Sequence, residues 1–249
     1  MSGLSTDYES RDNHDFLKRE NDATLSIHMD SFQYKDLGRI EYGEALCIQT
    51  EAFQNLIDAK IRKQSAANVL FFCEHSPVYT LGKKGQDSNL LVSGKWLETR
   101  GISLYHTNRG GDITFHGPGQ ITGYPVFDLE SFRIGLRQYV ETLEEIIIRF
   151  LSLYEIRGER LPGATGVWLE PNTEQVRKIC AIGIKSSRFV TMHGFALNIN
   201  TDLVNFSLIN PCGFKDKGVT SLSNELGREI DIDMCKMQLV SLFAETFHN

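Results

Sequence analysis

The chain has 249 residues, of which 41% are hydrophobic, and a formal net charge of −6 at pH 7. This length suits one domain of ordinary size, or one domain with an appendage. The acidic balance disfavours nucleic acid as a partner, because phosphate-binding domains usually carry a basic excess. No stretch is long and apolar enough to span a bilayer, and the N-terminus has no secretory pattern, so we expect no membrane partner.

The cysteines predict a protein of the reducing cytoplasm. There are five of them, an odd number, and no two form a CxxC pair, which argues against a disulfide framework or a zinc ribbon. A metal site built from Cys73, His75, His116 and His193 lacks the spacing of zinc ligands. We therefore expect a cytoplasmic protein with no metal and no other cofactor.

The first thirty residues differ in composition from the rest of the chain. Residues 1–30 are polar and charged, with little periodicity, and are predicted to be a flexible extension. Met29 offers a second interpretation, in which translation begins at that residue. The catalytic domain is then predicted to cover residues 31–249.

From residue 34 onward, helical and extended patterns alternate. Helices are predicted over 42–61, over 131–154 with Ser131 as N-cap, and over 231–247. Strands are predicted at 68–73, 78–81, 102–105, 113–115, 121–128, 165–169, 177–185 and 190–199, with the last two forming a hairpin. The predicted fold class is α+β, a mixed sheet with helices packed on it.

The most informative segment runs from Asn108 to Gln120. It contains four glycines, one proline, Arg109 and His116, and it cannot be regular structure throughout. Such a segment brings backbone close to a ligand while holding one cation and one imidazole beside it. We interpret it as a substrate-cradling loop.

Two cysteines are candidate nucleophiles on sequence grounds alone. Cys212 lies in the turn Asn210-Pro211-Cys212-Gly213, where a thiol tends to be exposed enough to react. Lys178 precedes Cys180 by two residues, and strand alternation places both on one face if no bulge intervenes. A lysine beside a thiol lowers the thiol pKa, so Cys180 is a rival to Cys212.

Several ordered motifs resemble those of the octanoyltransferases of lipoate synthesis, also called lipoyl(octanoyl) transferases. They are His75-Ser76-Pro77-Val78-Tyr79-Thr80-Leu81-Gly82, Arg109-Gly110-Gly111 through Gln120, Gly123-Tyr124-Pro125, Gly163-Ala164-Thr165-Gly166-Val167-Trp168, Lys178-Ile179, His193-Gly194-Phe195-Ala196-Leu197-Asn198 and Asn210-Pro211-Cys212-Gly213. The resemblance extends from about residue 34 to the C-terminus. One departure is Cys180, where family members commonly have alanine.

The resemblance implies a fold like the catalytic domain of biotin and lipoate protein ligases, and an acyl-enzyme mechanism. Cys212 falls on the family's nucleophile and Lys178 on its partner lysine, with Tyr124 and His193 as supporting polar groups. The segments that line the substrate correspond to Arg109, Gly110, Gly111, Asp112, Ile113, Thr114, Phe115, His116, Ala181, Ile182, Gly183, Gly194, Phe195 and Ala196.

The implied reaction moves an octanoyl group from octanoyl-acyl carrier protein to a lysine of a lipoyl domain without ATP. Implied acceptors are the lipoyl domains of 2-oxoacid dehydrogenase E2 subunits and the H protein of glycine cleavage. Because both protein partners are usually acidic, a local basic patch must attract them. The candidates are Lys83, Lys84, Lys95, Arg100 and Arg109.

Three other functions remain open. An ATP-dependent lipoate- or biotin-protein ligase on the same fold needs no cysteine nucleophile, although the biotin-ligase signature Gly-Arg-Gly-Arg is absent here. A non-catalytic acyl-binding module could keep the fold without the activity. A papain-like cysteine hydrolase is remote, because the required order of cysteine, histidine and asparagine is missing.

Overall fold

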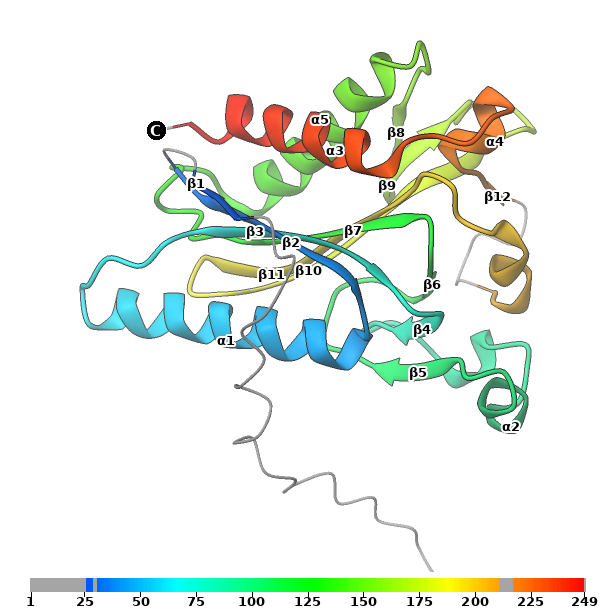
Figure 1. Ribbon diagram of the computed structural model, residues 1–249, viewed down its shortest axis with the longest axis horizontal. Helices are drawn as coiled ribbons and strands as arrows, with labels where there is room; N and C mark the ends of the chain where they lie inside the picture. Colours follow the sequence, from blue (N-terminus) through cyan, green and yellow to red (C-terminus); the bar gives the residue numbers. More distant parts are fainter. Residues whose placement is uncertain (1–25, 29–30, 211–216, 249) are drawn as a thin grey trace, which may run out of the picture.

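A large mixed β-sheet runs through the middle of the molecule, with helices on both faces (Figure 1). The computed structural model describes residues 26–28, 31–210 and 217–248. Within these residues the large sheet has nine strands, ordered β1-β2-β3-β7-β11-β10-β9-β8, with β12 beside β10. The strands are β1 (Ser26–His28), β2 (Gln33–Ile40), β3 (Val69–His75), β7 (Gln120–Val126), β8 (Glu159–Leu161), β9 (Ala164–Leu169), β10 (Arg177–Ser187), β11 (Val190–Asn198) and β12 (Gly218–Val219).

A second, three-stranded sheet lies beside one end of the large one. Its strands β4 (Val78–Leu81), β5 (Ser103–His106) and β6 (Ile113–His116) follow the order β5-β4-β6. Parallel and antiparallel pairs occur in both sheets, since β2 is parallel to β3 and β4 is parallel to β5. The predicted class, α+β with a mixed sheet, is confirmed.

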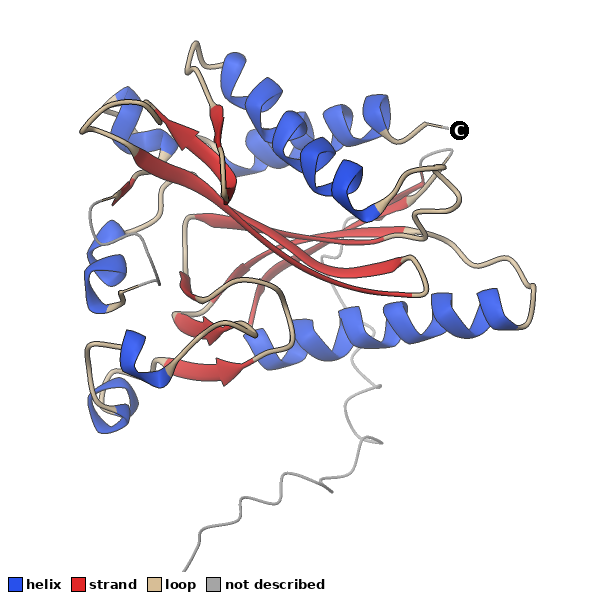
Figure 2. Cartoon of the chain, turned by 180° about the vertical axis from the view of Figure 1, so that it is seen from behind, coloured by secondary structure: helices blue, strands red, loops and turns tan. Residues whose placement is uncertain are grey.

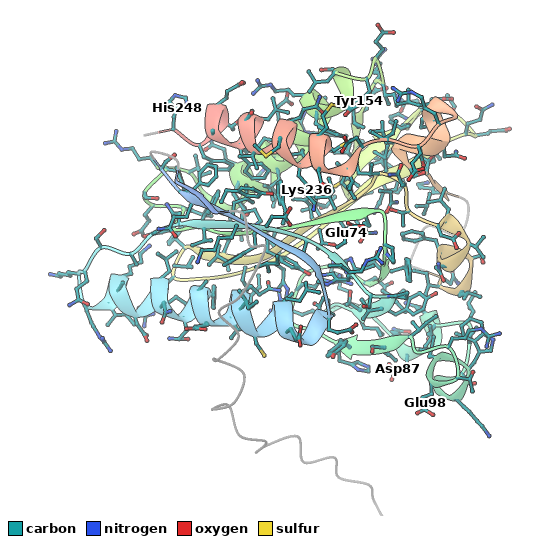
Figure 3. All side chains as sticks on the ribbon, in the orientation of Figure 1. Glu74, Asp87, Glu98, Tyr154, Lys236 and His248 are labelled. Atoms are coloured by element: carbon teal, nitrogen blue, oxygen red, sulfur yellow. The ribbon has the colours of Figure 1, made fainter. Side chains whose placement is uncertain are left out.

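Helices cover the two faces of the large sheet, as the reverse view shows (Figure 2). On one face α1 (Tyr42–Ile61) packs against β7 and β11, and on the other α3 (Leu136–Ser152) packs against β9, β10 and α5 (Ile232–Thr246). Short helices complete the fold: α2 (Gly94–Glu98), α4 (Leu222–Leu226), η2 (Asp87–Asn89) and η3 (Leu203–Leu208). On α5, the Lys236 ammonium donates to Asp36 on β2 over 2.9 Å and ties the last helix to the sheet (Figure 3).

The pleat explains how one sheet serves two apolar layers. Alternate residues of β3 face opposite sides, so Leu70 and Phe72 join the core under α3 and α5 while Phe71 joins the core over α1. The hairpin of β10 and β11 is confirmed. Its turn residues Arg188 and Phe189 have φ of 50° and 63°, which suits the tight turn between twisted strands.

Two sequence expectations need correction. The helix predicted from Ser131 begins at Leu136 with Gly135 as its N-cap. The Ser131 hydroxyl donates instead to the Asp128 carbonyl, and Arg133 with φ of 56° interrupts any helix between them. Strand β1 lies inside the predicted extension, where it pairs with β2. Residues 1–25 lie outside the described part of the chain.

Candidate active site

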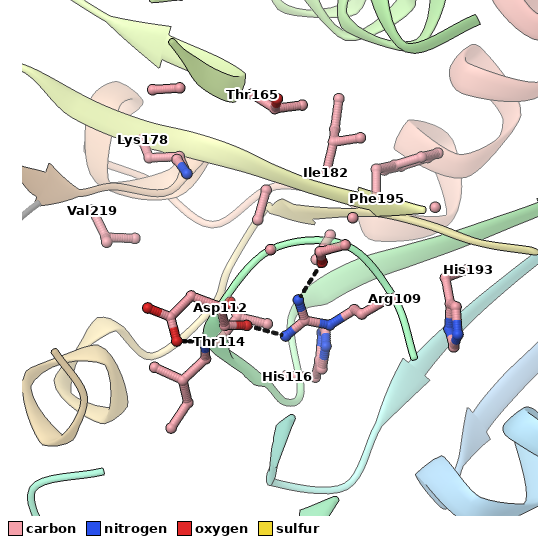
Figure 4. A pocket seen from close by; sticks show the side chains of 18 of the residues that line it. Arg109, Asp112, Thr114, His116, Thr165, Lys178, Ile182, His193, Phe195 and Val219 are labelled. Carbon is pink, nitrogen blue, oxygen red and sulfur yellow. Dashed lines mark hydrogen bonds between the residues drawn. The ribbon is translucent and has the colours of Figure 1, made fainter. Parts of the chain in front are cut away.

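A cavity of about 790 Å³ opens between the large sheet and the glycine-rich segment that leads into β6 (Figure 4). All of the predicted substrate-binding residues except Phe115 line it, and so do Tyr124, His193 and Lys178. The Phe115 ring packs with Tyr79 in the core of the small sheet, while its strand neighbours Thr114 and His116 face the cavity. Lys178 lies on one side of the cavity and His193 on the other.

The predicted nucleophile, Cys212, lies outside the described residues. The residues before and after that segment are described, and both Asn210 and Lys217 line the cavity. The Asn210 amide donates to the Asn89 carbonyl over 2.7 Å, and the Gly218 amide donates to the Val176 carbonyl over 2.9 Å. Asn210 and Gly218, two hydrogen-bonded backbone positions that line the cavity, therefore stand before and after the segment that carries Cys212 in the chain.

Arg109 holds the glycine-rich loop in place from within. Its side chain is buried, with 8% exposure, and its guanidinium donates to the carbonyls of Thr80, Gly110 and Asp112 over 2.7–2.9 Å. Burial lowers the Arg109 pKa from its ordinary value. A buried cation that binds three carbonyls fixes the backbone of the loop, and Arg109 is therefore not part of a surface patch.

The glycines of this loop permit a close approach of two backbones. The Gly110 amide donates to the Ile184 carbonyl on β10 over 2.9 Å. A Cβ atom on Gly183 would lie 2.6 Å from the Gly110 carbonyl oxygen, closer than real Cβ atoms come to such an atom. Gly111 has φ of 87°, where side chains are strained. Gly183 therefore lets the loop lie directly on β10, and Gly111 lets the loop turn there.

A chain of buried hydrogen bonds continues from Arg109 along the cavity floor. The Thr80 hydroxyl accepts from Arg109 over 2.9 Å and donates to His116 Nε2 over 3.2 Å, since the neutral His116 ring carries its proton on Nδ1. His116 Nδ1 then donates to Gln120 Oε1 over 2.8 Å, because the Gln120 amide nitrogen donates to Asn198 over 2.9 Å. Burial lowers the pKa of His116 well below its ordinary value, and its imidazole is therefore neutral.

Two more buried histidines, His193 in the cavity and His75 beside the cavity residue Tyr124, are neutral for the same reason. Burial lowers the pKa of His75 to about 4 and that of His193 to about 3. His75 Nδ1 donates to the Ile40 carbonyl, which can only accept, so Nδ1 carries the proton of the neutral ring. Its Nε2 therefore accepts from the Tyr124 hydroxyl over 2.6 Å. His193 Nε2 donates to Asn108 Oδ1 over 2.9 Å and so clips the start of the glycine-rich loop to β11. These imidazoles act as positioning groups.

Sequence reasoning missed three buried polar residues, two of which, Gln120 and Asn198, line the cavity. Thr80, Gln120 and Asn198 connect the loop to β11, but only Gln120 stands in the glycine-rich run that drew attention. Thr80 and Asn198 fall inside apolar runs that form buried strands. A single polar residue in such a run needs a hydrogen-bond partner inside the fold, and this pattern could have indicated a buried polar network.

Lys178 occupies a very different setting. It pairs in register with Trp168 on β9 and with Val219 on β12, and its ammonium nitrogen lies 4.5 Å from the centroid of the Trp168 ring. Burial lowers the pKa of Lys178 to about 8, with the thiol of Cys180 acting in the opposite sense. The side chain can therefore exchange a proton near neutral pH.

Cys180 does not share the face of Lys178. The β9–β10 register shifts between Lys178 and Cys180, and this bulge turns the Cys180 side chain into the core, where it is fully buried. Burial raises the Cys180 pKa above its ordinary value, the opposite of what a nucleophile needs. A bulge does intervene between the two residues, so Lys178 and Cys180 do not lie on one face of the strand, and Cys180 is a core residue.

Two further features concern metals and membranes. Across residues 26–28, 31–210 and 217–248, no group of three or more His, Cys, Asp or Glu side chains could hold a metal ion. In the same part of the chain, no helix combines the length and the apolar character that crossing a membrane requires.

The family model of the lipoyl protein ligase A/B catalytic domain matches residues 42–244. The fold is shared with a bipartite lipoate protein ligase of Thermoplasma acidophilum (TM-score 0.63, 17% identity, 89% of this chain and 85% of that one). It is shared equally with a lipoate-protein ligase A bound with ATP (TM-score 0.59, 17% identity, 80% of each chain). These likenesses define the class, a catalytic domain of the lipoate-ligase fold.

A narrower likeness comes from sequence. An octanoyltransferase of Parabacteroides distasonis is 66% identical over 220 residues, which cover 88% of this chain and 100% of that one. The chain therefore belongs to the octanoyltransferase family, within the lipoyl protein ligase A/B catalytic domains.

Proposed function

We propose that the protein transfers an octanoyl group from octanoyl-acyl carrier protein to a lysine of a lipoyl domain, through a thioester on Cys212. The observation that carries this proposal is Lys178. In a chain of the octanoyltransferase family, a half-buried lysine with a pKa of about 8 lines the same cavity as Asn210 and Lys217, the described residues on either side of the segment that carries Cys212.

The first half-reaction is a thioester exchange. The Cys212 thiolate attacks the octanoyl carbonyl, the bond to the pantetheine sulfur breaks, and the carrier leaves as a thiol after taking a proton. The Lys178 ammonium stabilises the thiolate and is the group that can supply the proton. One thioester replaces another, so little net energy changes and no ATP is consumed.

The second half-reaction forms the amide. The acceptor lysine amine attacks the Cys212 thioester, loses a proton to neutral Lys178, and releases the cysteine sulfur. A pKa of about 8 suits a residue that must be an acid in one step and a base in the next. Amides of the glycine-rich loop are candidates to bind the oxyanion, each contributing about 3 kcal/mol.

The acyl chain needs an apolar slot. Ile182, Phe195 and Ala196 present apolar surface to the cavity, between Lys178 on one side and His193 on the other. Burial of each methylene contributes about 0.8 kcal/mol, so filling the slot favours an eight-carbon chain over shorter ones.

The acyl carrier protein approaches the cavity mouth in this proposal. The exposed Lys83 and Lys84 sit on a turn that donates backbone hydrogen bonds to the Arg109 and Gly111 carbonyls over 3.0 Å, and Lys84 lines the cavity. With Arg109 buried, Lys83, Lys84, Lys95 and Arg100 remain as candidates for the basic patch. Lipoyl domains of E2 subunits and the H protein are the proposed acceptors, and the cytoplasm the proposed location.

The experiment is intact-protein mass spectrometry after mixing with octanoyl-acyl carrier protein, without ATP. We expect a hydroxylamine-labile octanoyl adduct on the wild type and on Cys180→Ala, and none on Cys212→Ala. Transfer to an isolated lipoyl domain should then proceed without nucleotide. An adduct that survives Cys212→Ala and is lost in Cys180→Ala would move the nucleophile to Cys180. No adduct on any variant, or turnover that requires ATP, would instead support a ligase mechanism.

A further inference from the structure

The niche that holds Lys178 depends on an irregular stretch of β9. The register of β8 against β9 shifts between Arg160 and Leu161, so Gly166 lacks a ladder partner there. Gly166 has φ of 121°, a conformation that side chains rarely adopt. A Cβ atom there would lie 2.5 Å from the Cys180 carbonyl oxygen and 3.6 Å from Lys178 Cε. The bare backbone of Gly166 therefore forms one side of the Lys178 niche.

A carboxylate from another layer of the fold holds this stretch. Glu144 lies on α3 with 7% exposure, and its Oε1 accepts from the Gly166 amide over 2.9 Å. Its Oε2 accepts from Arg160 Nε over 3.1 Å, so both carboxylate oxygens have partners. A buried carboxylate with one oxygen on an irregular strand amide fixes that strand more firmly than packing alone.

The opposite side of the niche depends on the same bulge. The Trp168 indole donates across it to the Ala164 carbonyl over 2.9 Å, and this bond sets the ring that lies against the Lys178 ammonium. Gly166 stands between these two residues. Any movement of the Gly166 amide therefore displaces both the backbone beneath Lys178 and the ring beside it.

We propose that Glu144 is a positioning residue for Lys178: by holding the Gly166 amide, it keeps the niche closed around the amine. The inference rests on the proposed function only in giving Lys178 a role in transfer. Without the Glu144 bond, the bulge relaxes toward a regular ladder, water enters beside Trp168, and the amine loses its orientation toward the cavity.

The charges around Lys178 allow this proposal to be separated from a simple electrostatic effect. The Cys180 thiol on the same strand acts on the Lys178 ammonium, and Glu144 on α3 acts in turn on that thiol, while Lys217 just before β12 lines the same cavity. Loss of a nearby carboxylate charge, by itself, lowers the pKa of an ammonium. Loss of the bond to Gly166 hydrates the niche and raises it. The two explanations therefore predict opposite signs.

The test measures the Lys178 titration directly, by competitive trace acetylation of the full-length protein at a series of pH values and mass spectrometry of the Lys178 peptide. Glu144→Asp keeps the charge but is one methylene too short to reach Gly166, and Glu144→Gln keeps an oxygen acceptor but loses the charge. We expect Glu144→Asp to move the Lys178 midpoint upward from about 8, toward 10.5, and Glu144→Gln not to raise it.

Glu145→Ala is the matched control. Glu145 also pairs with Arg160, over 2.8 Å, but the Gly166 amide binds Glu144. The Lys178 midpoint in Glu145→Ala should therefore equal that of the wild type. In octanoyl transfer, Glu144→Asp should lower kcat by about tenfold or more with little change in KM, as a misplaced catalytic group does. An unchanged or lowered midpoint in folded Glu144→Asp overturns the proposal. A raised midpoint in Glu144→Asp, together with a wild type that has no transferase activity, overturns the proposed function instead.

Discussion

The two walls of the cavity are built on opposite principles. The loop wall, residues 108–116, is held by hydrogen bonds: Arg109 binds three carbonyls, and His193 clips Asn108. The strand wall, residues 163–168, 178 and 217–219, surrounds Lys178 with the Trp168 ring and the backbone of Gly166. The loop wall thus fixes groups whose charge state does not change, while the strand wall tunes a group that gains and loses a proton.

The largest effect should follow from removing the tuned group. We expect Lys178→Ala to lower the rate of octanoyl transfer by about a thousandfold, since it removes both the electrostatic partner of the thiolate and the base for the amine. The single-turnover rate of transfer to a lipoyl domain measures this loss. Lys185→Ala, which alters a lysine that packs on Phe53 at the far end of the same strand, should keep its rate.

A full rate in Lys178→Ala would mean that the strand wall holds Lys178 for structural reasons alone and not as a group that gains and loses a proton.

Lys178→Arg tests separately whether Lys178 must release a proton. A guanidinium keeps the charge but does not release its proton, so we expect the acyl adduct to form while transfer to the amine fails.

Substitutions in the loop wall should reduce activity by disturbing the backbone of the loop, not by changing the protonation of a catalytic group. We expect Arg109→Met to lower the free energy of unfolding by about 3 kcal/mol, because three carbonyls lose a charged donor. Octanoyl transfer should fall about a hundredfold as the loop shifts. Urea unfolding and steady-state kinetics measure the two effects. Arg109→Lys should recover little, since one ammonium cannot reproduce the planar fork that reaches Thr80, Gly110 and Asp112.

The two walls also differ in their response to pH. With Lys178 as base and a pKa of about 8, the rate of transfer from a preformed acyl-enzyme should rise about tenfold between pH 7 and pH 9. The imidazoles of His75 and His193, with pKa values near 4 and 3, stay neutral throughout this range. A rise centred near pH 6.5 would place a histidine, and therefore the loop side of the cavity, in the proton transfer.

The same pKa has a consequence for stability. Lys178 titrates near 8 in the folded protein and near 10.5 when unfolded, so the unfolded state holds more protons between these values. Its contribution to stability is therefore unfavourable below pH 8 and disappears above pH 10.5. Lys178→Met should unfold with a higher free energy than the wild type at pH 7, and the difference should shrink as pH rises.

These predictions use features that the sequence reveals unevenly. The helix α1 and the strand β4 could be predicted to the residue, because periodic and continuous apolar patterns are local. The glycine-rich loop could be assigned to the site because its motif is long and ordered, whereas Lys178, in the short motif Lys178-Ile179, could be assigned only through the family resemblance. Local patterns do not predict β1, because it is extended through its antiparallel pairing with β2.

The bulge and the burial of Arg109 could not be predicted for a related reason. The shift between Lys178 and Cys180 depends on how β9 lies beside β10, and the partners of Arg109 include a carbonyl on β4 that is 29 positions away. Long polar side chains usually lie at the surface, so an arginine that binds backbone inside the fold contradicts the ordinary expectation. Only the assembled structure supplies those carbonyls.

The smallest effect concerns the thiol that the bulge turns away from the cavity. We expect Cys180→Ala to lower the free energy of unfolding by about 1 kcal/mol, the ordinary result of trimming a buried side chain, and to leave octanoyl transfer within about twofold of the wild type. Because alanine lacks only the sulfur atom of cysteine, the core should accept the smaller side chain with little rearrangement.

A large loss of transfer in Cys180→Ala would break the division between the two walls. It would mean that the strand wall places a reactive thiol beside Lys178, despite full burial of Cys180 and a pKa raised above its ordinary value. Alkylation with iodoacetamide near pH 8 gives an independent measure. Cys180 should resist modification in the folded protein and react only in urea, because the thiolate that attacks the reagent is the form that burial disfavours.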